Sequence, residues 1–371
     1  MADLKTTICG IEFPNPIWTA AGPASANADL LCQAVKGGAG ALVTKTISVR
    51  PAKVPIPNIH VPFQGSLLNA ELWSEMEYHK FIHEELPRVK ATGAKIIVSV
   101  GYSPEDLSLL GKELAKSGLV DAVEFSIHYI GKDIKNLEQT ATALKQNINV
   151  PVLAKLSPSI QDLTTVVNAL HHIIDGFVAI NSVGPALDFN IQTLEPYLGS
   201  EDGRAWLSGS AILPIGLHFV AKISELTPKP VIGVGGIRRV EDVIKYIMAG
   251  ASAVQVCSQA ILKGRHIYSS LAEELSSWMD AHHYSDIKNL RGIFHNRKSQ
   301  KQYFLGHGPQ LYPKFIVECC HFCDKCIKSC IHQAIHFKDK NFFLDKSKCV
   351  SCGLCISLCP RQALMMTEQE N

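Results

Sequence analysis

The sequence predicts an α/β protein made of a (β/α)8 TIM barrel followed by a small cysteine-rich domain. Eight short apolar, β-branched runs alternate with amphipathic helical stretches over about the first 280 residues, which is typical of a barrel. Nine of the twelve cysteines lie after residue 318, which marks a separate unit. A doubly wound parallel sheet is the alternative for the first part. The expected boundaries are a barrel over 1–285, a linker over 286–314 and the small domain over 315–371.

Composition narrows the function classes. The chain has 371 residues, 36 of them Lys or Arg and 34 Asp or Glu, so its net charge of +2 indicates neither a nucleic acid nor a membrane surface as partner. The sequence shows no signal peptide and no apolar stretch of membrane-spanning length. We therefore expect a cytoplasmic protein, in which disulfides are rare and the cysteines need another explanation.

The strands and helices follow from hydrophobic periodicity. The expected strands cover residues 16–20, 41–46, 95–101, 121–127, 151–157, 176–182, 230–236 and 252–258. Ser103 and Ser159 stand where the N-caps of the next helices belong. Long connections over 47–74 and 183–210 follow the second and sixth strands, so in a barrel both lie at the C-terminal face, where active sites are built.

The cysteines form two runs with one spacing, C-x2-C-x2-C-x3-C, which is the pattern of a bacterial-type 2[4Fe–4S] ferredoxin domain. The fourth cysteine of each run ligates the other cluster in this pattern. One predicted set is Cys320, Cys323, Cys326 and Cys359, and the other is Cys349, Cys352, Cys355 and Cys330. Zinc is the alternative, but it usually takes its ligands as two separated pairs. Between the runs, a hairpin is expected with its turn near Asp339.

Polar residues end several strands of the predicted barrel. Lys45 and Lys155 lie within apolar runs, and Asn181 and Ser182 end the sixth strand. Since lysine is rarely buried without a partner, two such lysines indicate an anionic or electron-rich ligand in the barrel mouth.

Glycine-rich turns follow the last two strands, in "GVGGIR" and "VCSQA". Such turns present bare backbone N–H groups and commonly bind phosphate in barrels. The dinucleotide fingerprint GxGxxG is absent. A phosphate site and lysines in a chain that also carries clusters point to FMN, which can exchange electrons in pairs or singly.

These stretches together resemble the dihydroorotate dehydrogenase superfamily, and the layout is most similar to the FMN and iron–sulfur part of dihydropyrimidine dehydrogenase. The matching segments include "NPIWTAAGP", "GGAGALVTKT", "NAELWSE", "PVLAKLSP", "AINSVG" and "VIGVGGI". The resemblance covers the barrel from about residue 3 to residue 285 and the ferredoxin module from about residue 315.

The resemblance implies roles for individual residues. Lys155 would lie beside N1 and O2 of the flavin and stabilise its reduced form, and Cys257 would contribute its backbone only. The implied flavin contacts are Ala21, Gly22, Lys45, Thr46, Ser126, Lys155, Asn181, Gly209, Gly235, Gly236, Cys257 and Ser258. The implied substrate contacts are Asn69, Glu71, Asn181 and Ser182.

One segment departs from the family pattern. Where the family has "ELNLSCPN" or "ELNLSCPH", this chain has "EFSIHYIG". Aligned on Glu124, Ser126 replaces an asparagine and Tyr129 takes the place of the cysteine that acts as general acid or base. Three interpretations remain open: Tyr129 or its neighbour His128 transfers the proton, the substrate differs, or the activity is lost.

The resemblance implies an FMN and iron–sulfur oxidoreductase that transfers hydride at a C=C or CH–CH bond of a small, pyrimidine-like cyclic substrate of the uracil, thymine or dihydroorotate type. Two [4Fe–4S] clusters would relay electrons to an FAD/NAD(P)H reductase subunit or a ferredoxin, and a homodimer is among the expected assemblies. The alternatives are a reductase of another unsaturated cyclic or enoyl compound, an electron-transfer flavoprotein subunit without its own substrate, and a barrel that binds a phosphorylated metabolite without flavin.

Overall fold

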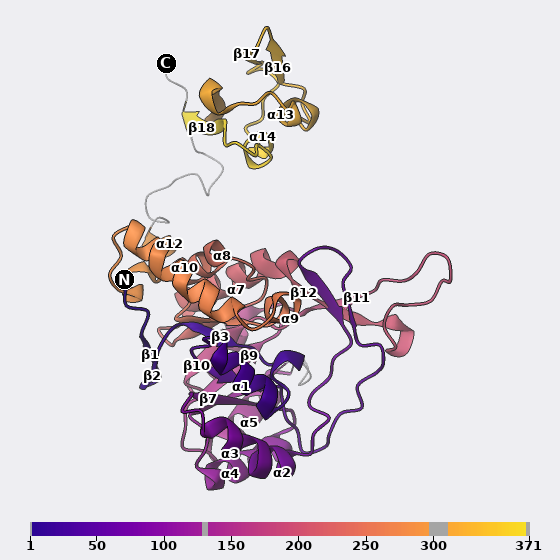
Figure 1. Cartoon of the computed structure of the whole chain (residues 1–371), viewed down its shortest axis with the longest axis vertical. Helices are drawn as coiled ribbons and strands as arrows, with labels where there is room; N and C mark the ends of the chain where they lie inside the picture. Colours follow the sequence, from indigo (N-terminus) through magenta and orange to yellow (C-terminus); the bar gives the residue numbers. More distant parts are fainter. Residues whose placement is uncertain (1, 128–132, 297–310, 369–371) are drawn as a thin grey trace. The chain divides into compact units, whose positions relative to one another are not determined.

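The computed structural model describes residues 2–127, 133–296 and 311–368 (Figure 1). The chain divides into two compact units, Met1–Asn296 and Arg297–Asn371. Two short helices, α11 (Ile287–Leu290) and α12 (Ile293–Asn296), lie within the stretch expected to be a linker, and the first described strand after it begins at Leu311. Among the described residues, no helix is both long and apolar enough to cross a membrane.

The first unit is a barrel of eight parallel strands, each within a predicted segment. In sheet order they are β3 (Ile17–Thr19), β14 (Ala253–Val256), β13 (Val231–Val234), β10 (Gly176–Ala179), β9 (Val152–Leu156), β8 (Ala122–Ser126), β7 (Ile96–Val100) and β4 (Leu42–Val43). Thr19 joins the two ends of this sheet: its N–H donates to Ala41 O at 3.1 Å, and Val43 N–H donates to its Oγ1 at 2.6 Å. The predicted TIM barrel is therefore confirmed, and the doubly wound alternative is wrong.

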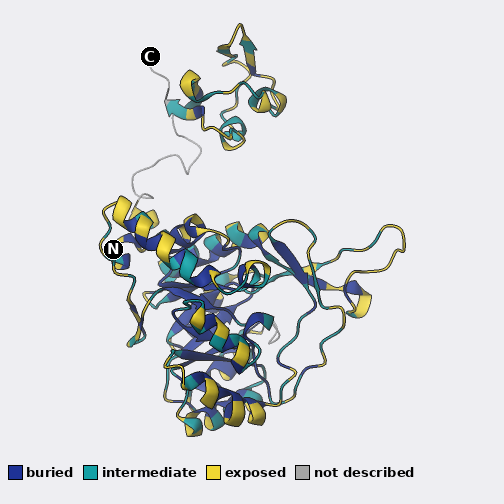
Figure 2. Ribbon diagram, viewed as in Figure 1, coloured by how far each residue is buried: buried dark blue, intermediate teal, exposed yellow. Residues whose placement is uncertain are grey.

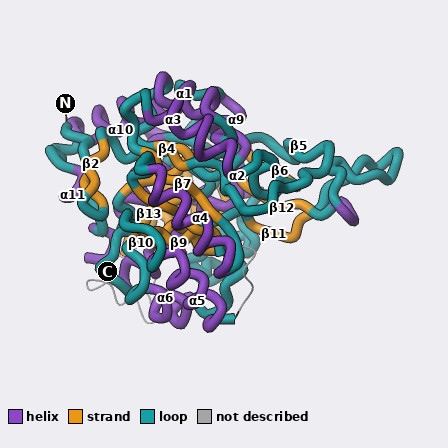
Figure 3. Tube along the Cα trace, turned by 90° about the horizontal axis from the view of Figure 1, so that it is seen from below, coloured by secondary structure: helices purple, strands orange, loops and turns teal. Residues whose placement is uncertain are grey.

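Helices surround this barrel (Figures 1 and 3). They are α1 (Ala28–Lys36), α2 (Tyr78–Lys80) with the π-helix η2 (Phe81–Glu85), α3 (Leu86–Lys90), α4 (Pro104–Ser117), α5 (Ile134–Lys145), α6 (Leu163–Leu170), α7 (Leu213–Leu226), α8 (Val240–Met248), α9 (Ser258–Lys263) and α10 (Ile267–Ala281). Ser103 caps α4 by accepting from Asp106 N, as predicted. The prediction for Ser159 is wrong, because Asp162 caps α6 instead.

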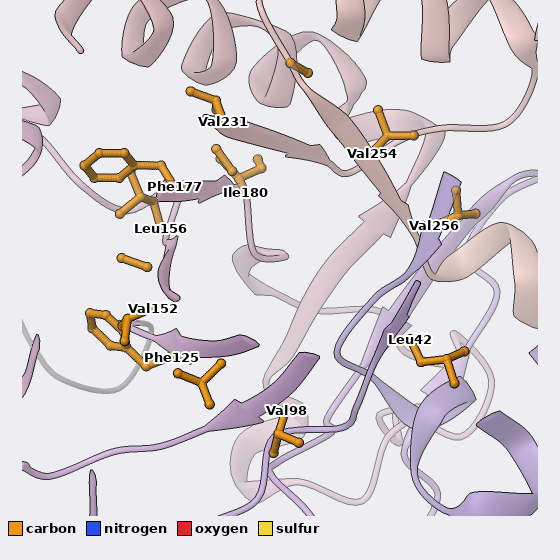
Figure 4. Packing of buried hydrophobic residues seen from close by; sticks show 14 of the residues in the cluster. Leu42, Val98, Phe125, Val152, Leu156, Phe177, Ile180, Val231, Val254 and Val256 are labelled. Atoms are coloured by element: carbon orange, nitrogen blue, oxygen red, sulfur yellow. The ribbon is translucent and has the colours of Figure 1, made fainter. Parts of the chain in front are cut away.

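Strand side chains alternate between two apolar clusters. Outward-facing residues such as Val98, Phe125 and Phe177 pack with the buried faces of the helices, and Figure 4 shows them along the strands. Inward-facing residues near the start of the strands pack with Phe13 of the hairpin formed by β1 (Thr6–Ile8) and β2 (Ile11–Phe13). The hairpin thus plugs the N-terminal end of the barrel, and Figure 2 shows the barrel interior as buried.

The two long connections pair with each other in an antiparallel sheet. Its order is β11 (Val183–Ala186), β12 (Ala205–Gly209), β6 (Ser66–Asn69) and β5 (Ile59–His60). It projects from one side of the barrel in Figure 3. This sheet was not predicted, but both connections were expected at the C-terminal face, and the sheet fixes their positions there.

The second unit consists of two similar halves. Strand β15 (Leu311–Phe315) pairs with β18 (Leu364–Glu368), and α13 (Lys325–Lys328) and α14 (Leu354–Ser357) lie within the first and second cysteine runs, before the fourth cysteine of each. The predicted hairpin is confirmed as β16 (Ile335–Lys338) and β17 (Asn341–Leu344), with Asp339 and Lys340 at positive φ in its turn. Four phenylalanines contact one another but remain partly exposed: Phe315, Phe322, Phe337 and Phe342. With so small a core, the unit depends on its cysteine sites for stability.

Phe13→Ala should lower the free energy of unfolding of the barrel by about 3–5 kcal/mol, because it empties the plug beside Trp18. All four tryptophans lie in the first unit, so tryptophan fluorescence in urea measures that unit. The control Glu12→Ala changes an exposed residue of the same strand and should stay within about 0.5 kcal/mol of wild type. Equal effects of the two variants would show that the hairpin does not plug the barrel.

Candidate active site and cluster sites

One cavity opens at the C-terminal ends of the barrel strands. It spans about 1170 Å³ of space, part of which is open solvent at its mouth. All of the flavin and substrate residues implied by the resemblance line it: Ala21, Gly22, Lys45, Thr46, Asn69, Glu71, Ser126, Lys155, Asn181, Ser182, Gly209, Gly235, Gly236, Cys257 and Ser258. His128 and Tyr129 lie outside the described residues.

Three polar side chains meet in the interior of the barrel at the base of this cavity. Lys155 on β9 lies with its Nζ 3.4 Å from Glu124 Oε1 and donates to Gln255 Oε1 at 3.3 Å. Gln255 Nε2 donates to Glu124 Oε2 at 2.6 Å. Because β14 and β8 lie four strands apart in the ring, this last bond crosses the barrel. The sequence prediction missed Gln255, although a polar residue in the run "SAVQV" was a visible signal.

The wall of the cavity holds a second ion pair. Lys45 Nζ lies 2.5 Å from Glu71 Oε2, and Asn58 Nδ2 donates to Glu71 Oε1 at 2.6 Å. Asn69 is oriented by its bond to Trp206 O, at 3.1 Å. Both lysines that were expected to face an anionic ligand are thus paired with carboxylates, so the two ion pairs together add no net charge. No local pattern indicates a role for Asn58, which lies in a long connection.

Bare backbone surrounds the remaining part of the cavity. Gly236 has a φ of 82°, and a Cβ there would lie 2.5 Å from the backbone of Leu213. Gly209 has the same φ, and a Cβ there would lie 2.4 Å from Gly65 O. Nearby, the hydroxyls of Ser208 and Ser258 are 2.9 Å apart. Backbone N–H groups of glycine turns and hydroxyls suit a phosphate, so this part of the cavity lining fits the phosphate end of FMN.

Cys257 and Ser126 complete the lining. Burial raises the pKa of the Cys257 thiol, so the neutral thiol is favoured, in keeping with a purely structural role. Asn181 Nδ2 donates to Ser126 Oγ at 3.3 Å, which joins the ends of β10 and β8. Ser126 therefore lies at the site, where the family pattern has an asparagine.

The cysteines of the second unit gather around two small cavities. One is lined by Cys320, Cys323, Cys326 and Cys359, and the other by Cys330, Cys349, Cys352 and Cys355. Each set draws three ligands from one run and the fourth from the other. Ala334 N–H and Ala363 N–H donate to the sulfurs of Cys330 and Cys359 at 3.3 and 3.2 Å, in equivalent positions of the two halves. Four thiols around each space fit a [4Fe–4S] cluster, and Cys319 lines neither.

The ion pair at the cavity base is expected to be strongly coupled. Lys155→Met should cost about 3–5 kcal/mol of unfolding free energy, because it leaves the fully buried Glu124 carboxylate without its cation. The double variant Lys155→Met/Glu124→Gln should cost less than the sum of the single variants by about 0.5–3 kcal/mol. Tryptophan fluorescence of the cofactor-free protein in urea measures both values.

The exposed pair of Lys116 and Glu113 serves as the matched control, since its atoms are only 2.7 Å apart yet its coupling should be near zero. If the unfolding free energies lost in Lys155→Met and in Glu124→Gln simply add in the double variant, the predicted coupling of the buried pair is wrong.

Comparison with known proteins assigns both units of the chain to known families. The family described as dihydroorotate dehydrogenase matches residues 3–279, and the 4Fe–4S dicluster domain matches residues 319–363. The catalytic subunit of dihydroorotate dehydrogenase B (NAD(+)) from Thermoplasma acidophilum is 33% identical over 303 residues, which cover 79% of this chain and 99% of that protein.

The proteins of the same description from Methanocaldococcus jannaschii and Methanosarcina mazei are each 34% identical, and the matches cover 79% of this chain and 98% and 95% of those proteins. About a fifth of this chain therefore lies beyond the match to each. The chain belongs to the dihydroorotate dehydrogenase family of flavin oxidoreductases acting on CH–CH bonds, and it carries a 4Fe–4S dicluster domain after the barrel.

Proposed function

We propose that this protein transfers hydride between bound FMN and the CH–CH bond of a small, uncharged, pyrimidine-like ring, and that two [4Fe–4S] clusters relay the electrons to a partner protein. The observation that carries the proposal is the single cavity that brings a glycine-rich cradle, the buried Lys155 and a polar wall together. When bound, FMN would supply the exchange of an electron pair with the substrate and of single electrons with the clusters.

Lys155 is the residue proposed to support the flavin. Glu124 and Gln255 hold its ammonium group at the base of the cavity, where it is only 4% exposed. A fixed positive charge in a site shielded from water stabilises negative charge on a bound ring without reorganisation.

The wall residues are proposed to read the substrate. Asn69, Asn181 and Ser182 offer amide and hydroxyl groups to the carbonyls of a pyrimidine ring, and the Glu71 carboxylate can accept from a ring N–H. A site that pairs each polar edge of a ring rejects analogues lacking those groups. Such a wall also argues against an electron conduit without a substrate, which would not need it.

Charge favours an uncharged ring over dihydroorotate. Lys45 and Lys155 are each paired with a carboxylate, so neither is left to bind the carboxylate of dihydroorotate. That carboxylate would instead lie near the carboxylate of Glu71, and the repulsion between the two negative charges in a partly dehydrated site would weaken binding. Dihydroorotate remains the second candidate, because the named relatives are dihydroorotate dehydrogenases.

The proton donor is proposed to come from the segment after β8. His128 and Tyr129 follow Ser126, which lines the cavity, by two and three positions. Both side-chain types can transfer a proton at neutral pH when placed within reach of a substrate.

Anaerobic titration of the purified holoprotein should show that dihydrouracil or dihydrothymine bleaches the flavin absorbance faster than dihydroorotate does. Glu71→Gln keeps the shape but removes the charge, so it should slow bleaching by dihydrouracil about tenfold or more and narrow the preference over dihydroorotate. Glu195→Gln, an exposed change in the other long connection, is the control and should match wild type. Faster bleaching by dihydroorotate would support the second candidate, and no bleaching by any of the three would refute the proposed substrate class.

Tyr129→Phe should slow the same bleaching about a hundredfold, because general acid–base catalysis contributes about 10²–10⁴-fold, while reduction by dithionite stays unchanged. His128→Asn is the paired variant. If His128→Asn alone causes the loss, histidine is the donor, and if neither variant does, the proton comes from another group.

A further inference from the structure

We propose that the cluster site formed by Cys320, Cys323, Cys326 and Cys359 is the place where an acidic one-electron carrier protein docks. The cations that would recognise it are Lys325, Lys340 and Arg361. This inference rests on the proposed function in one respect, namely that electrons leave the chain through its clusters.

The two units differ in charge. Residues 297–371 contain 11 Lys and Arg against 6 Asp and Glu, whereas residues 1–296 contain 25 against 28. The net charges are +5 and −3, which add to the +2 of the whole chain. The polypeptide around the clusters is therefore the basic part of a nearly neutral protein.

Cations gather around the first cluster site. Lys325 and Arg361 line its cavity, and Lys340 Nζ lies 5.8 Å from the ring centroid of Phe322, which lines the same cavity. All three cations are exposed. Asp324 is the one acidic residue on the lining, and no ion pair between a described carboxylate and any of the three cations is present. Their charge is therefore available to a partner.

The second cluster site has a different rim. Its lining contains no Lys, Arg, Asp or Glu, and its titratable residues are the four cysteines and His332. Val350 on this rim is 56% exposed. Lys346, which precedes the proposed ligand Cys349 by three positions, lies over the ring of Tyr312, and Lys348 pairs with Asp345. Charge thus distinguishes the two sites, although their cysteine ligands are arranged alike.

Electrostatic complementarity identifies the partner's chemistry. Exposed charges around a redox centre steer an oppositely charged protein to it and set the encounter rate and orientation. Contacts between electron carriers are small and transient, so a few exposed cations beside the cluster are sufficient. An acidic carrier would be attracted more strongly to the first site than to the second, whose lining contains no Lys or Arg.

The test measures binding of the oxidised, anaerobically purified full chain to an acidic plant-type [2Fe–2S] ferredoxin by calorimetry. The affinity should fall about tenfold or more as NaCl rises from about 50 to about 300 mM, because screening weakens exposed charge pairs. The triple variant Lys325→Glu/Lys340→Glu/Arg361→Glu should weaken binding at low salt about tenfold or more. Lys346→Glu is the control, because it reverses one charge beside the other cluster site. Its affinity for the ferredoxin should stay within about twofold of wild type.

Iron content and the cluster absorbance must match wild type in every variant, so that loss of binding is not loss of a cluster. Three results would overturn the proposal. The first is ferredoxin binding that does not depend on salt, and the second is an equal loss of affinity in the single variants Lys346→Glu and Lys325→Glu. The third is binding of basic cytochrome c or of duplex DNA as tight as that of the ferredoxin. Because no substrate is present, the result stands apart from the flavin titration: failure there with intact ferredoxin binding would refute the proposed substrate and leave the docking site in place.

Discussion

Closure of eight parallel strands into a ring is the constraint on which the site depends. In a closed ring, alternate side chains of every strand point to one shared interior, and the strand ends converge at two mouths. The β1–β2 hairpin fills the N-terminal mouth, so the interior is open to a ligand only at the other end. Residues as distant in sequence as Lys45, Lys155 and Gln255 therefore line one cavity, with no further element needed to bring them together.

Charge balance is the second feature that shapes the cavity. The interior holds Lys155 against Glu124, and the wall holds Lys45 against Glu71, so each buried cation has its own carboxylate. Burying unpaired charges would be costly, whereas paired ones can be retained where function requires them. The consequence is a cavity whose lining is polar but balanced in charge. The described part of the second unit has only a small apolar core, so we expect its stability to depend on its cysteine sites.

The sequence predicted the features that depend on hydrophobic periodicity and on the spacing of cysteines along the chain. The eight barrel strands and the grouping of the cysteines follow from β-branched runs and from the C-x2-C-x2-C-x3-C spacing, both of which are local signals. It failed where non-local packing decides. Ser159 was a plausible cap, but Asp162 stands directly before the apolar face that packs on the barrel. The antiparallel sheet of β5, β6, β11 and β12 needs two segments more than 100 residues apart to pair, which no local pattern indicates. Asn58 was missed because its role depends on its contact with Glu71, which no local pattern indicates. Gln255 was missed although it stands as a polar residue in an apolar run.

The central claim is that one chain connects substrate oxidation at the flavin to its own two clusters. The most direct measurement is electron paramagnetic resonance of anaerobic holoprotein frozen after addition of dihydrouracil, with FMN-free protein as the reference. The account predicts signals of reduced [4Fe–4S] clusters in the FMN-loaded sample and none in the reference. A flavin that bleaches while both clusters stay oxidised would contradict it, because the barrel and the dicluster domain would then not form one electron path.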